Sequence, residues 1–329
     1  MAIGQGFKSY MQFGLESVWG TGVAATNKLE IISADVNPDM GVILDPSLNN
    51  SVGRRGLYQG GIVYRGTIVL RCNYVGLSRI MKSLFGVAGV STNVEVAISW
   101  DNVFHDGQSQ LTVQSLTIEL IEGDILTGKC QRLLGAIFQS CTIRGTAGQG
   151  QDAMLQVELE VVAKDKVVNF TPTAALTFPA VAPVLTKQGL LEDDGVTTSG
   201  LIMQSFEVQY RAPHADDRFF IGSANPAEFI RSDFVGATWR FTQDLQTDDA
   251  LEALQQFTSA TPDLVFRGPA LGANFYEFEI QSLAGQITRA AHVVAGYGVV
   301  RLESTVEAFH HATNGTFYVR FRNNENGIL

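Results

Sequence analysis

Histidine, cysteine and acidic side chains are the groups that most often carry catalysis or bind metals, and the sequence holds five histidines and three cysteines. The cysteines, Cys72, Cys130 and Cys141, lack the spacing of a metal site, and their odd number does not complete a set of disulfides. We interpret them as reduced thiols that pack in a core as small hydrophobic side chains.

The only histidine cluster is His310-His311, which has Glu307 upstream. On a strand, adjacent side chains point to opposite faces of the sheet, so these two imidazoles cannot easily share one ion. The paired acids Asp216-Asp217 lie in a polar stretch without a partner that would mark an acid or a base. No G-x-S-x-G, Walker or H-E-x-x-H motif occurs. The sequence therefore predicts no catalytic residue, no metal site, no cofactor and no enzyme activity.

The length of 329 residues suits two domains of about 150 residues each. A hydrophobic fraction of 45% with only 17% charged residues indicates an ordered chain with enough apolar surface to assemble. The formal net charge of −10 argues against a protein that grips phosphate backbones, although an acidic surface can let DNA pass. The sequence shows neither a signal-peptide pattern nor an apolar run of membrane-spanning length, so we expect synthesis in a cytoplasm without membrane contact.

One unit occurs twice in the sequence, and such a repeat is a stronger guide to the fold than a short motif. Gly66–Phe85 reads as a strand of alternating polarity, a polar break and an amphipathic helix, and Gly236–Phe257 repeats that order. The first helix carries an apolar stripe typical of a core-facing side, formed by Leu77, Ile80, Met81 and Leu84. We predict a mainly β (α+β) fold of two tandem copies of one module.

The remaining segments give the predicted boundaries. We expect residues 1–27 to form an N-terminal arm that becomes ordered against a neighbour, with an edge strand as the alternative. The first module then covers residues 28–168 and the second covers residues 200–329. Between them, residues 169–199 are rich in Pro, Ala and Thr and predict a linker.

The first module contains a segment that is long for a simple connection. We expect a strand over Leu29–Val36 that ends at Asn37-Pro38. The following Asp39–Gly61 is rich in Gly, Asn, Pro and Arg, and a connection of this length is usually a binding loop. Within it, Arg54-Arg55 is a candidate contact for an acidic neighbour.

Two later segments share a pattern of charge. The polar positions of residues 155–161 are Gln156, Glu158 and Glu160, and those of residues 300–309 include Glu303, Thr305 and Glu307. On a strand, each pattern places an acidic row opposite an apolar row. An ordinary solvent-facing side is one interpretation. The other is the wall of a channel that repels polyanions and does not retard them.

Four pieces of the sequence together point to one family: the opening YMQFGLESVWGTGVAAT, the unit VYRGTIVLRCNYVGLSRIMKSLFG, and the strands SLTIEL and FQSCTIRG. The most specific of them is Glu16-Ser17-Val18-Trp19-Gly20-Thr21, an E-x-x-W-G-T pattern. In this order they resemble the major tail tube proteins of long-tailed, siphovirus-like bacteriophages. The resemblance covers most of the chain, and the second half shares mainly the order of elements.

The resemblance implies that each of the two tandem tail-tube modules is a β-sandwich or half-barrel with one flanking α-helix. It also implies a structural virion protein that self-assembles into stacked rings, which form the hollow conduit for DNA ejection. It implies inter-ring contacts from the N-terminal residues and the long loop, with the candidates Trp19, Arg54, Arg55 and Tyr58. It also makes the acidic rows lumen candidates through Glu158, Glu160, Glu303 and Glu307. Because single-module relatives form six-membered rings, a two-module chain is expected to close as a trimer with pseudo-sixfold symmetry.

The partners that the resemblance implies are further copies of the chain, a tape-measure protein, tail terminator and tail-tip proteins, and DNA that passes without specific binding. Assembly is expected in the host cytoplasm, and the product in the virion tail. Two other classes stay open. A non-enzymatic surface adhesion or carbohydrate-binding β protein predicts clustered aromatic residues in loops, and a β-rich hydrolase needs convergent acids or a His-based pair.

Overall fold

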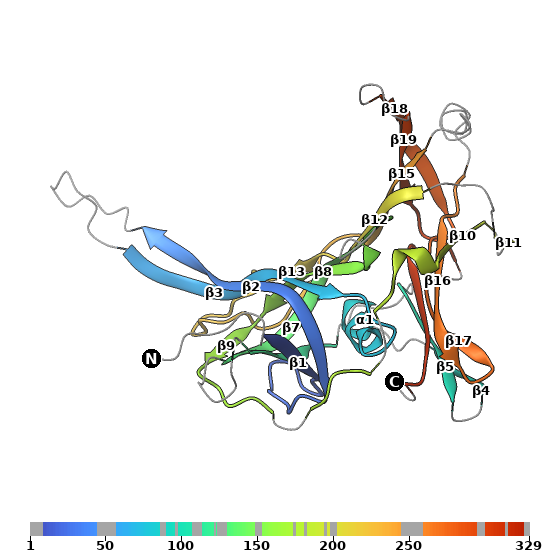
Figure 1. Ribbon diagram of the computed structural model, residues 1–329. Coiled ribbons are helices and arrows are strands. Elements are labelled where there is room, and N and C mark those ends of the chain that lie inside the picture. Colours follow the sequence, from blue (N-terminus) through green and yellow to red (C-terminus); the bar gives the residue numbers. More distant parts are fainter. Residues whose placement is uncertain are drawn as a thin grey trace.

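The computed structural model shows a protein built almost entirely of β-strands, with one α-helix among its described residues (Figure 1). This confirms the predicted mainly β class. The structure describes residues 9–44, 57–85, 90–95, 98–106, 114–121, 123, 130–148, 153–173, 176–180, 183–193, 196–197, 203–244, 259–294, 300–312 and 315–325. Within these ranges no helix is both long enough and apolar enough to cross a membrane.

An 11-stranded antiparallel sheet, the large sheet, runs through both halves of the chain. Its strands in spatial order are β18 (Gly285–Val293), β19 (Arg301–Ala308), β15 (Gly236–Asp244), β12 (Met203–Arg211), β7 (Cys130–Thr146), β6 (Leu116–Ile121), β1 (Tyr10–Leu15), β2 (Asn27–Leu44), β3 (Leu57–Arg71) and β8 (Gln156–Ala163). The remaining strand, β9 (Asp165–Val168), pairs with β7.

The first part of the large sheet closes on itself, because β8 pairs with both β3 and β7. Two long strands make this closure possible. β2 pairs with β1 over residues 27–30 and with β3 over residues 31–44. β7 pairs with β6 over residues 130–136 and with β8 over residues 137–144. Each of these strands belongs to two layers, as strands do at the corners of a small barrel or sandwich.

A 7-stranded antiparallel sheet forms the second layer. Its strands in spatial order are β11 (Val196–Thr197), β10 (Gly189–Asp193), β16 (Asp263–Leu271), β17 (Asn274–Gln281), β20 (Tyr318–Asn323), β5 (Ser99–His105) and β4 (Val90–Glu95). The hairpin β4–β5 comes from the first half of the chain and joins the other strands through β20. Smaller elements are the pair β13 (His214–Ala215) and β14 (Ile230–Arg231) and the 3-10 helix η4 (Thr186–Gln188).

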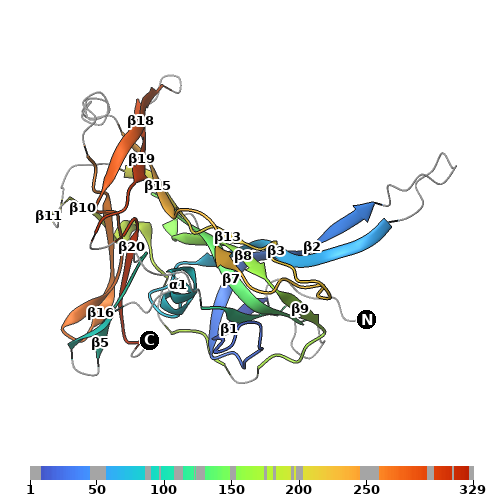
Figure 2. The same cartoon turned by 180° about the vertical axis from the view of Figure 1, so that it is seen from behind.

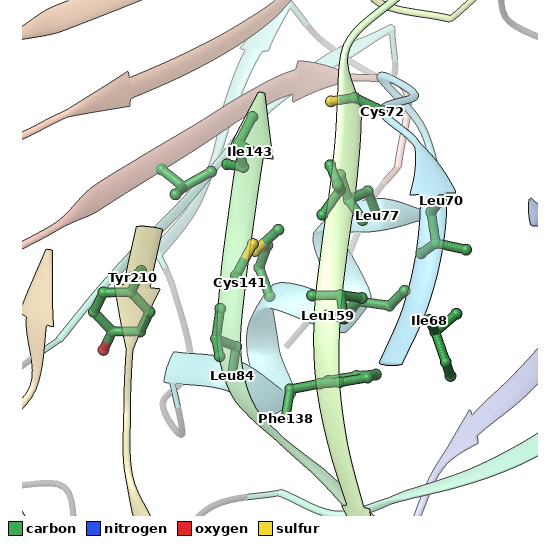
Figure 3. Close-up of a cluster of buried hydrophobic side chains, with 14 of the residues drawn as sticks. Ile68, Leu70, Cys72, Leu77, Leu84, Phe138, Cys141, Ile143, Leu159 and Tyr210 are labelled. Atoms are coloured by element: carbon green, nitrogen blue, oxygen red, sulfur yellow. The ribbon is translucent and has the colours of Figure 1, made fainter. Parts of the chain in front are cut away.

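The helix α1 (Leu77–Phe85) lies between the two sheets and contacts β7 in one and β5 in the other (Figures 1 and 2). The four residues of its predicted apolar stripe are each at most 1% exposed, which confirms that the stripe faces the core. Figure 3 shows Leu77 and Leu84 beside the inward side chains of β3, β7 and β8. Burial of each such side chain contributes roughly 1.5–3 kcal/mol.

The strand order of the large sheet contains one arrangement twice. A first quartet, β2-β3-β8-β7, is followed directly by a second quartet, β12-β15-β19-β18, and the two are joined by the pairing of β7 with β12. In each quartet the fourth strand in space (β7 or β18) comes before the third (β8 or β19) along the chain. The strands of the two predicted units, β3 and β15, hold the second place in their quartets. The second predicted helix, over residues 247–257, lies outside the described residues.

The ladders also give the alignment between the two quartets. Thr67 faces Glu160 across β3 and β8, and Thr238 faces Glu307 across β15 and β19. This alignment makes Gly66 the counterpart of Ala237 and not of Gly236. The opening glycines of the two sequence units are therefore one residue out of register, and a shift of one residue exchanges the two faces of a strand.

The strand expected to end at Asn37-Pro38 is longer than predicted, and the expected loop after it is wrong over much of its length. β2 continues through both residues to Leu44, and β3 begins at Leu57, so the segment is a long hairpin. In this part of β2, the described residues provide a strand neighbour on one side only. A proline fits there because its missing N–H need not break a ladder.

The first and middle segments contribute strands to the two sheets. β1, within the expected N-terminal arm, lies between β2 and β6, and its residues Met11 and Phe13 are fully buried. β10, within the expected linker, pairs with β16. The module boundaries stay a prediction, since the β7–β12 pairing and one hydrophobic core cluster join the two halves.

Candidate functional site

The cysteines are core residues, as interpreted from the sequence. All three are buried, and none of them forms a disulfide. Burial raises the pKa of the Cys141 thiol to about 12, and burial with the nearby Cys141 raises the pKa of Cys72 well above its usual value. A thiol that stays protonated is a weak nucleophile. Among the residues that the structure describes, no group of three or more His, Cys, Asp or Glu side chains could hold a metal ion.

The four acidic residues expected to line a channel all lie on the polar face of the large sheet, opposite its buried face. Along β8, two of them alternate with Leu159, which is fully buried, and along β19 the other two alternate with Val306, which is 4% exposed. β7, β12 and β15 separate the two strands. The four acidic residues therefore share one face of the sheet but do not form one cluster. They are Glu158, Glu160, Glu303 and Glu307.

The polar face is hollowed over five strands, β7, β12, β15, β18 and β19. The hollow has a volume of ≈790 Å³, and its lining includes Arg144, Glu207, Arg240, Arg289, Glu303 and Glu307. The lining comes from neighbouring strands of a single sheet, so the hollow is the concave side of that sheet. A concave, polar sheet face is the shape that the wall of a channel requires.

The polar face carries both signs of charge. Arg144 on β7 contacts Glu158 at 3.1 Å, and Arg240 on β15 contacts Glu207 at 3.0 Å. All four side chains are at least 36% exposed, and such pairs contribute about 0–1 kcal/mol each. The acidic row expected from single strands is thus interrupted in space by arginines of neighbouring strands. Alternation within one strand cannot reveal those neighbours.

Two of the acidic residues are held by hydroxyl groups at neighbouring positions. Ser140 Oγ donates to Glu160 at 3.1 Å, and Thr238 Oγ1 donates to Glu307 at 2.9 Å. Glu160 and Glu307 occupy equivalent positions in the two quartets. Each quartet therefore holds this carboxylate with a hydroxyl donor, which comes from the fourth strand, β7, in the first quartet and from the second strand, β15, in the second.

The β2–β3 hairpin projects away from the body of the protein (Figures 1 and 2). Its apolar side chains, each more than half exposed, are Met40, Val42, Ile43, Leu57 and Tyr58. Of the expected inter-ring contacts, Tyr58 is on this hairpin, while Arg54 and Arg55 lie outside the described residues. The other apolar residues were not predicted as contacts, although their enrichment in a segment interpreted as a loop was a signal. An exposed apolar patch of this kind marks an interaction surface.

The base of the hairpin is braced by the segment of the second half that contains β13 and β14. The Ile62 N–H donates to the Ala224 carbonyl at 2.9 Å, and Arg65 contacts Asp216 at 2.9 Å. The hairpin is therefore supported on one side before any other molecule binds it.

Trp19, the remaining expected inter-ring contact, makes its ring contacts within the chain. Its ring meets Phe229 edge to face at a centroid distance of 5.3 Å. Lys164 Nζ lies 4.4 Å from the centroid of the same ring. Phe229 belongs to the segment that braces the hairpin, so Trp19 connects the first strands to the second half of the chain. Its side chain is only partly exposed.

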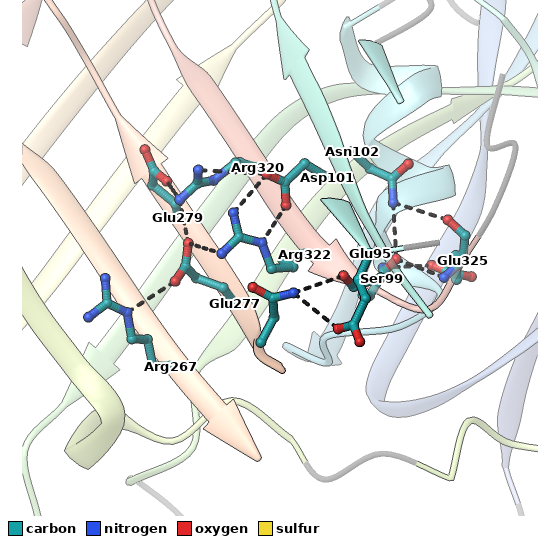
Figure 4. Close-up of polar contacts among 12 residues, drawn as sticks. Glu95, Ser99, Asp101, Asn102, Arg267, Glu277, Glu279, Arg320, Arg322 and Glu325 are labelled. Atoms are coloured by element: carbon teal, nitrogen blue, oxygen red, sulfur yellow. Dashed lines mark hydrogen bonds and ion pairs between the residues drawn. The ribbon is translucent and has the colours of Figure 1, made fainter. Parts of the chain in front are cut away.

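The face of the 7-stranded sheet opposite the core residues Phe278 and Ile280 carries a network of ion pairs (Figure 4). Arg322 donates two hydrogen bonds to Asp101 at 2.7 and 2.8 Å. Arg320 contacts both Glu277 and Glu279, which are 4% and 8% exposed. Carboxylates so deeply buried require a positive partner. This network stabilises the pairing of β17, β20 and β5.

A family model described as phage tail tube protein matches residues 6–303 of the 329-residue chain. The match begins before β1 and ends within β19, so nearly all of both quartets falls inside it. A search of curated proteins finds no match.

Proposed function

The chain belongs to the phage tail tube protein family, whose members are structural proteins of bacteriophage tails, and on this premise we propose that it is a major tail tube protein that self-assembles into stacked rings. The observation that carries the proposal is the repeated strand order of the large sheet. Two quartets side by side form an open, curved wall, and its outermost strands are β2 and β18. Open sheet edges favour association with further strands, and closure into a ring removes them.

The ring that we propose contains three chains. Each chain supplies two equivalent quartets, so three chains supply the six units of a pseudo-sixfold ring. The internal junction between β7 and β12 supports this count, because it already joins two quartets edge to edge within one chain.

The concave polar face would line the lumen, with Glu158, Glu160, Glu303 and Glu307 on the wall. Carboxylates repel phosphate groups, and two of the arginines among them, Arg144 and Arg240, are already paired with acidic neighbours. DNA would therefore pass during ejection without specific binding. The tape-measure protein would occupy the lumen before ejection, and tail terminator and tail-tip proteins would bind the ends of the tube in the virion tail.

The β2–β3 hairpin would contact the next ring through its exposed apolar side chains. Tyr58 on the described part of the hairpin, and Arg54 and Arg55 between its two strands, are the contact candidates that we retain. Trp19 would act indirectly, because its ring packs on the segment that braces the hairpin. Burial of exposed apolar side chains in the contact would supply the driving force for stacking.

Electron microscopy of the purified protein tests the assembly. We expect hollow tubes, or rings at high concentration, with three chains per ring. Six chains per ring would contradict the trimer, and a persistent monomer with measurable affinity for sugars would favour the adhesion or carbohydrate-binding alternative.

The stacking role of the hairpin has its own test. In Leu57→Asp, a charge replaces a side chain that is 68% exposed, and we expect rings that no longer stack. The matched control is Phe275→Asp on β17, where the side chain is 51% exposed on the other sheet and stacking should persist.

The lumen assignment is tested by accessibility in the assembled tube. A cysteine in Glu303→Cys should not react with a maleimide on a gold particle too large to enter the tube. The control Thr92→Cys, on the exposed side of β4, should be decorated along the tube wall. Decoration of the Glu303→Cys tube wall would place the polar face outside.

A further inference from the structure

The junction between the two quartets indicates how two copies of the chain meet. Within one chain, β7 closes the first quartet and pairs antiparallel with β12, which opens the second. β18 holds the place of β7 in the second quartet, and β2 holds the place of β12 in the first. We propose that β18 of one copy pairs with β2 of the next copy in the same antiparallel manner. This inference rests on the ring assembly proposed above and specifies its interface.

The position of β2 in that interface follows from its ladder with β3. Asp35 faces Thr67 across these strands, as Gln209 faces Thr238 across β12 and β15. Thr67 and Thr238 are equivalent because they face Glu160 and Glu307, the carboxylates at the corresponding positions of the two quartets. Asp35 therefore takes the place of Gln209.

The position of β18 follows in the same way from its ladder with β19. Arg289 faces Thr305, which lies two residues before Glu307. In the first quartet Thr142 faces Glu158, which lies two residues before Glu160. Arg289 therefore takes the place of Thr142.

These equivalences give the register between copies. Gln209 faces Thr142 in the internal junction, so Asp35 of one copy faces Arg289 of the next. The next pairs along the ladder are Ala34 with Ala290 and Ser33 with Ala291. The neutral pair Gln209–Thr142 inside the chain thus corresponds to the oppositely charged pair Asp35–Arg289 between chains. The register was derived from the internal junction and the strand ladders alone, without reference to charge. Opposite charges directly across two strands stabilise that register over others.

Both strands are accessible where the pairing is proposed. Ser259 bridges to Gln286 at the start of β18, whereas over residues 287–293 β19 is the only strand neighbour among the described residues. On β2, Lys166 Nζ donates to the Val36 carbonyl at 2.8 Å, so the proposed ladder runs from Asp35 toward Ser33, away from this lysine. Asp35 and Arg289 are both exposed. A lysine beside an open strand is a common protection of free edges.

Disulfide formation between copies tests the register. Directly opposite positions bring Cβ atoms within roughly 4.5–5.5 Å, close to the range of a disulfide. We expect the variant with Ser33→Cys and Ala291→Cys to give covalent multimers when tubes are oxidised. The matched control combines Thr67→Cys with Ala291→Cys, because Thr67 is on the same face but one strand farther away, and it should stay monomeric on a denaturing gel.

Exchange of charge tests the Asp35–Arg289 pair. Asp35→Arg and Arg289→Asp each place like charges opposite one another and should raise the protein concentration needed for assembly by about two- to fivefold. The double variant should restore assembly, with thermal unfolding of each monomer as the check on folding. If wild-type protein forms rings but neither the disulfide nor the restoration is observed, the β18–β2 register is overturned and the ring proposal stands. If wild-type protein forms no rings, the ring proposal itself fails.

Discussion

The Glu16 carboxylate accepts a hydrogen bond from the backbone N–H of Gly135 at 3.0 Å, which ties the end of β1 to the middle of β7. The same carboxylate accepts hydrogen bonds from the Gly20 N–H at 2.8 Å and from the hydroxyl groups of Ser115 and Thr117 at 2.7 and 2.8 Å. Glu16 is 3% exposed. The first residue of the E-x-x-W-G-T pattern is therefore a structural centre that fixes three segments around one buried charge.

Glu16→Ala should lower the free energy of unfolding by about 3 kcal/mol, because it leaves several buried donors without an acceptor. Chemical denaturation of the monomer measures this change. The control is Glu30→Ala, since Glu30 is 53% exposed and contacts Arg71 at 3.6 Å, and its effect should stay within about 0.5 kcal/mol. Equal effects of the two substitutions would contradict the structural role of Glu16.

Gly66→Ala should destabilise the protein strongly, whereas Gly236→Ala should have little effect. A Cβ at Gly66 would collide with the Asp35 carbonyl and would lie 2.7 Å from the Val36 Cα, so β2 and β3 would have to separate. A Cβ at Gly236 would meet nothing within 4 Å. We expect a loss of about 2 kcal/mol or more for the first variant, as for other overpacked sites. Thermal unfolding of both variants measures the difference. Similar melting temperatures would contradict the close approach of β2 to Gly66.

Glu325 near the C-terminus stabilises the start of α1 from the opposite half of the chain. Its Oε2 accepts hydrogen bonds from the Gly76 N–H at 3.0 Å and from the Ser78 hydroxyl at 2.6 Å. A negative charge at a helix N-terminus is favourable, so Glu325→Ala should cost about 1–2 kcal/mol of unfolding free energy. Glu325→Gln should cost less because it keeps an acceptor. A null effect of Glu325→Ala in denaturant unfolding would argue against this cap.

The sequence allowed the local elements to be predicted where a single strand or helix carries its own pattern. The α1 stripe is buried as expected, and the alternation around Leu159 and Val306 correctly separates a polar from an apolar face. Pro38 was misread as a strand end because the usual cost of proline applies to a strand with two neighbours. Whether a strand has one neighbour or two is a tertiary property.

Contacts between distant segments could not be predicted in the same way. The β4–β5 hairpin joins the second half through β20, and Arg144 reaches Glu158 from another strand. Neither pairing leaves a periodic signal, since each depends on which edges meet in space. The one-residue offset between Gly66 and Gly236 has the same origin, because the ladder and not the opening glycine sets the register.

His214 should make the stability of the protein depend on pH on the acidic side. Burial and, to a smaller extent, the charge of Arg231, its partner across β13 and β14, together lower its pKa from 6.5 to about 4. In the unfolded chain the imidazole takes up a proton near pH 6.5, whereas the folded protein resists protonation until about pH 4. The unfolded state therefore binds more protons between these values, and stability falls as the pH falls through this window. The full loss of unfolding free energy across this window is about 3 kcal/mol.

The variant His214→Gln tests this dependence because it removes the titrating group. Its unfolding free energy should change less between pH 7 and pH 4 than that of the wild-type protein. Parallel pH profiles for the two proteins would show that His214 is not kept neutral by the fold.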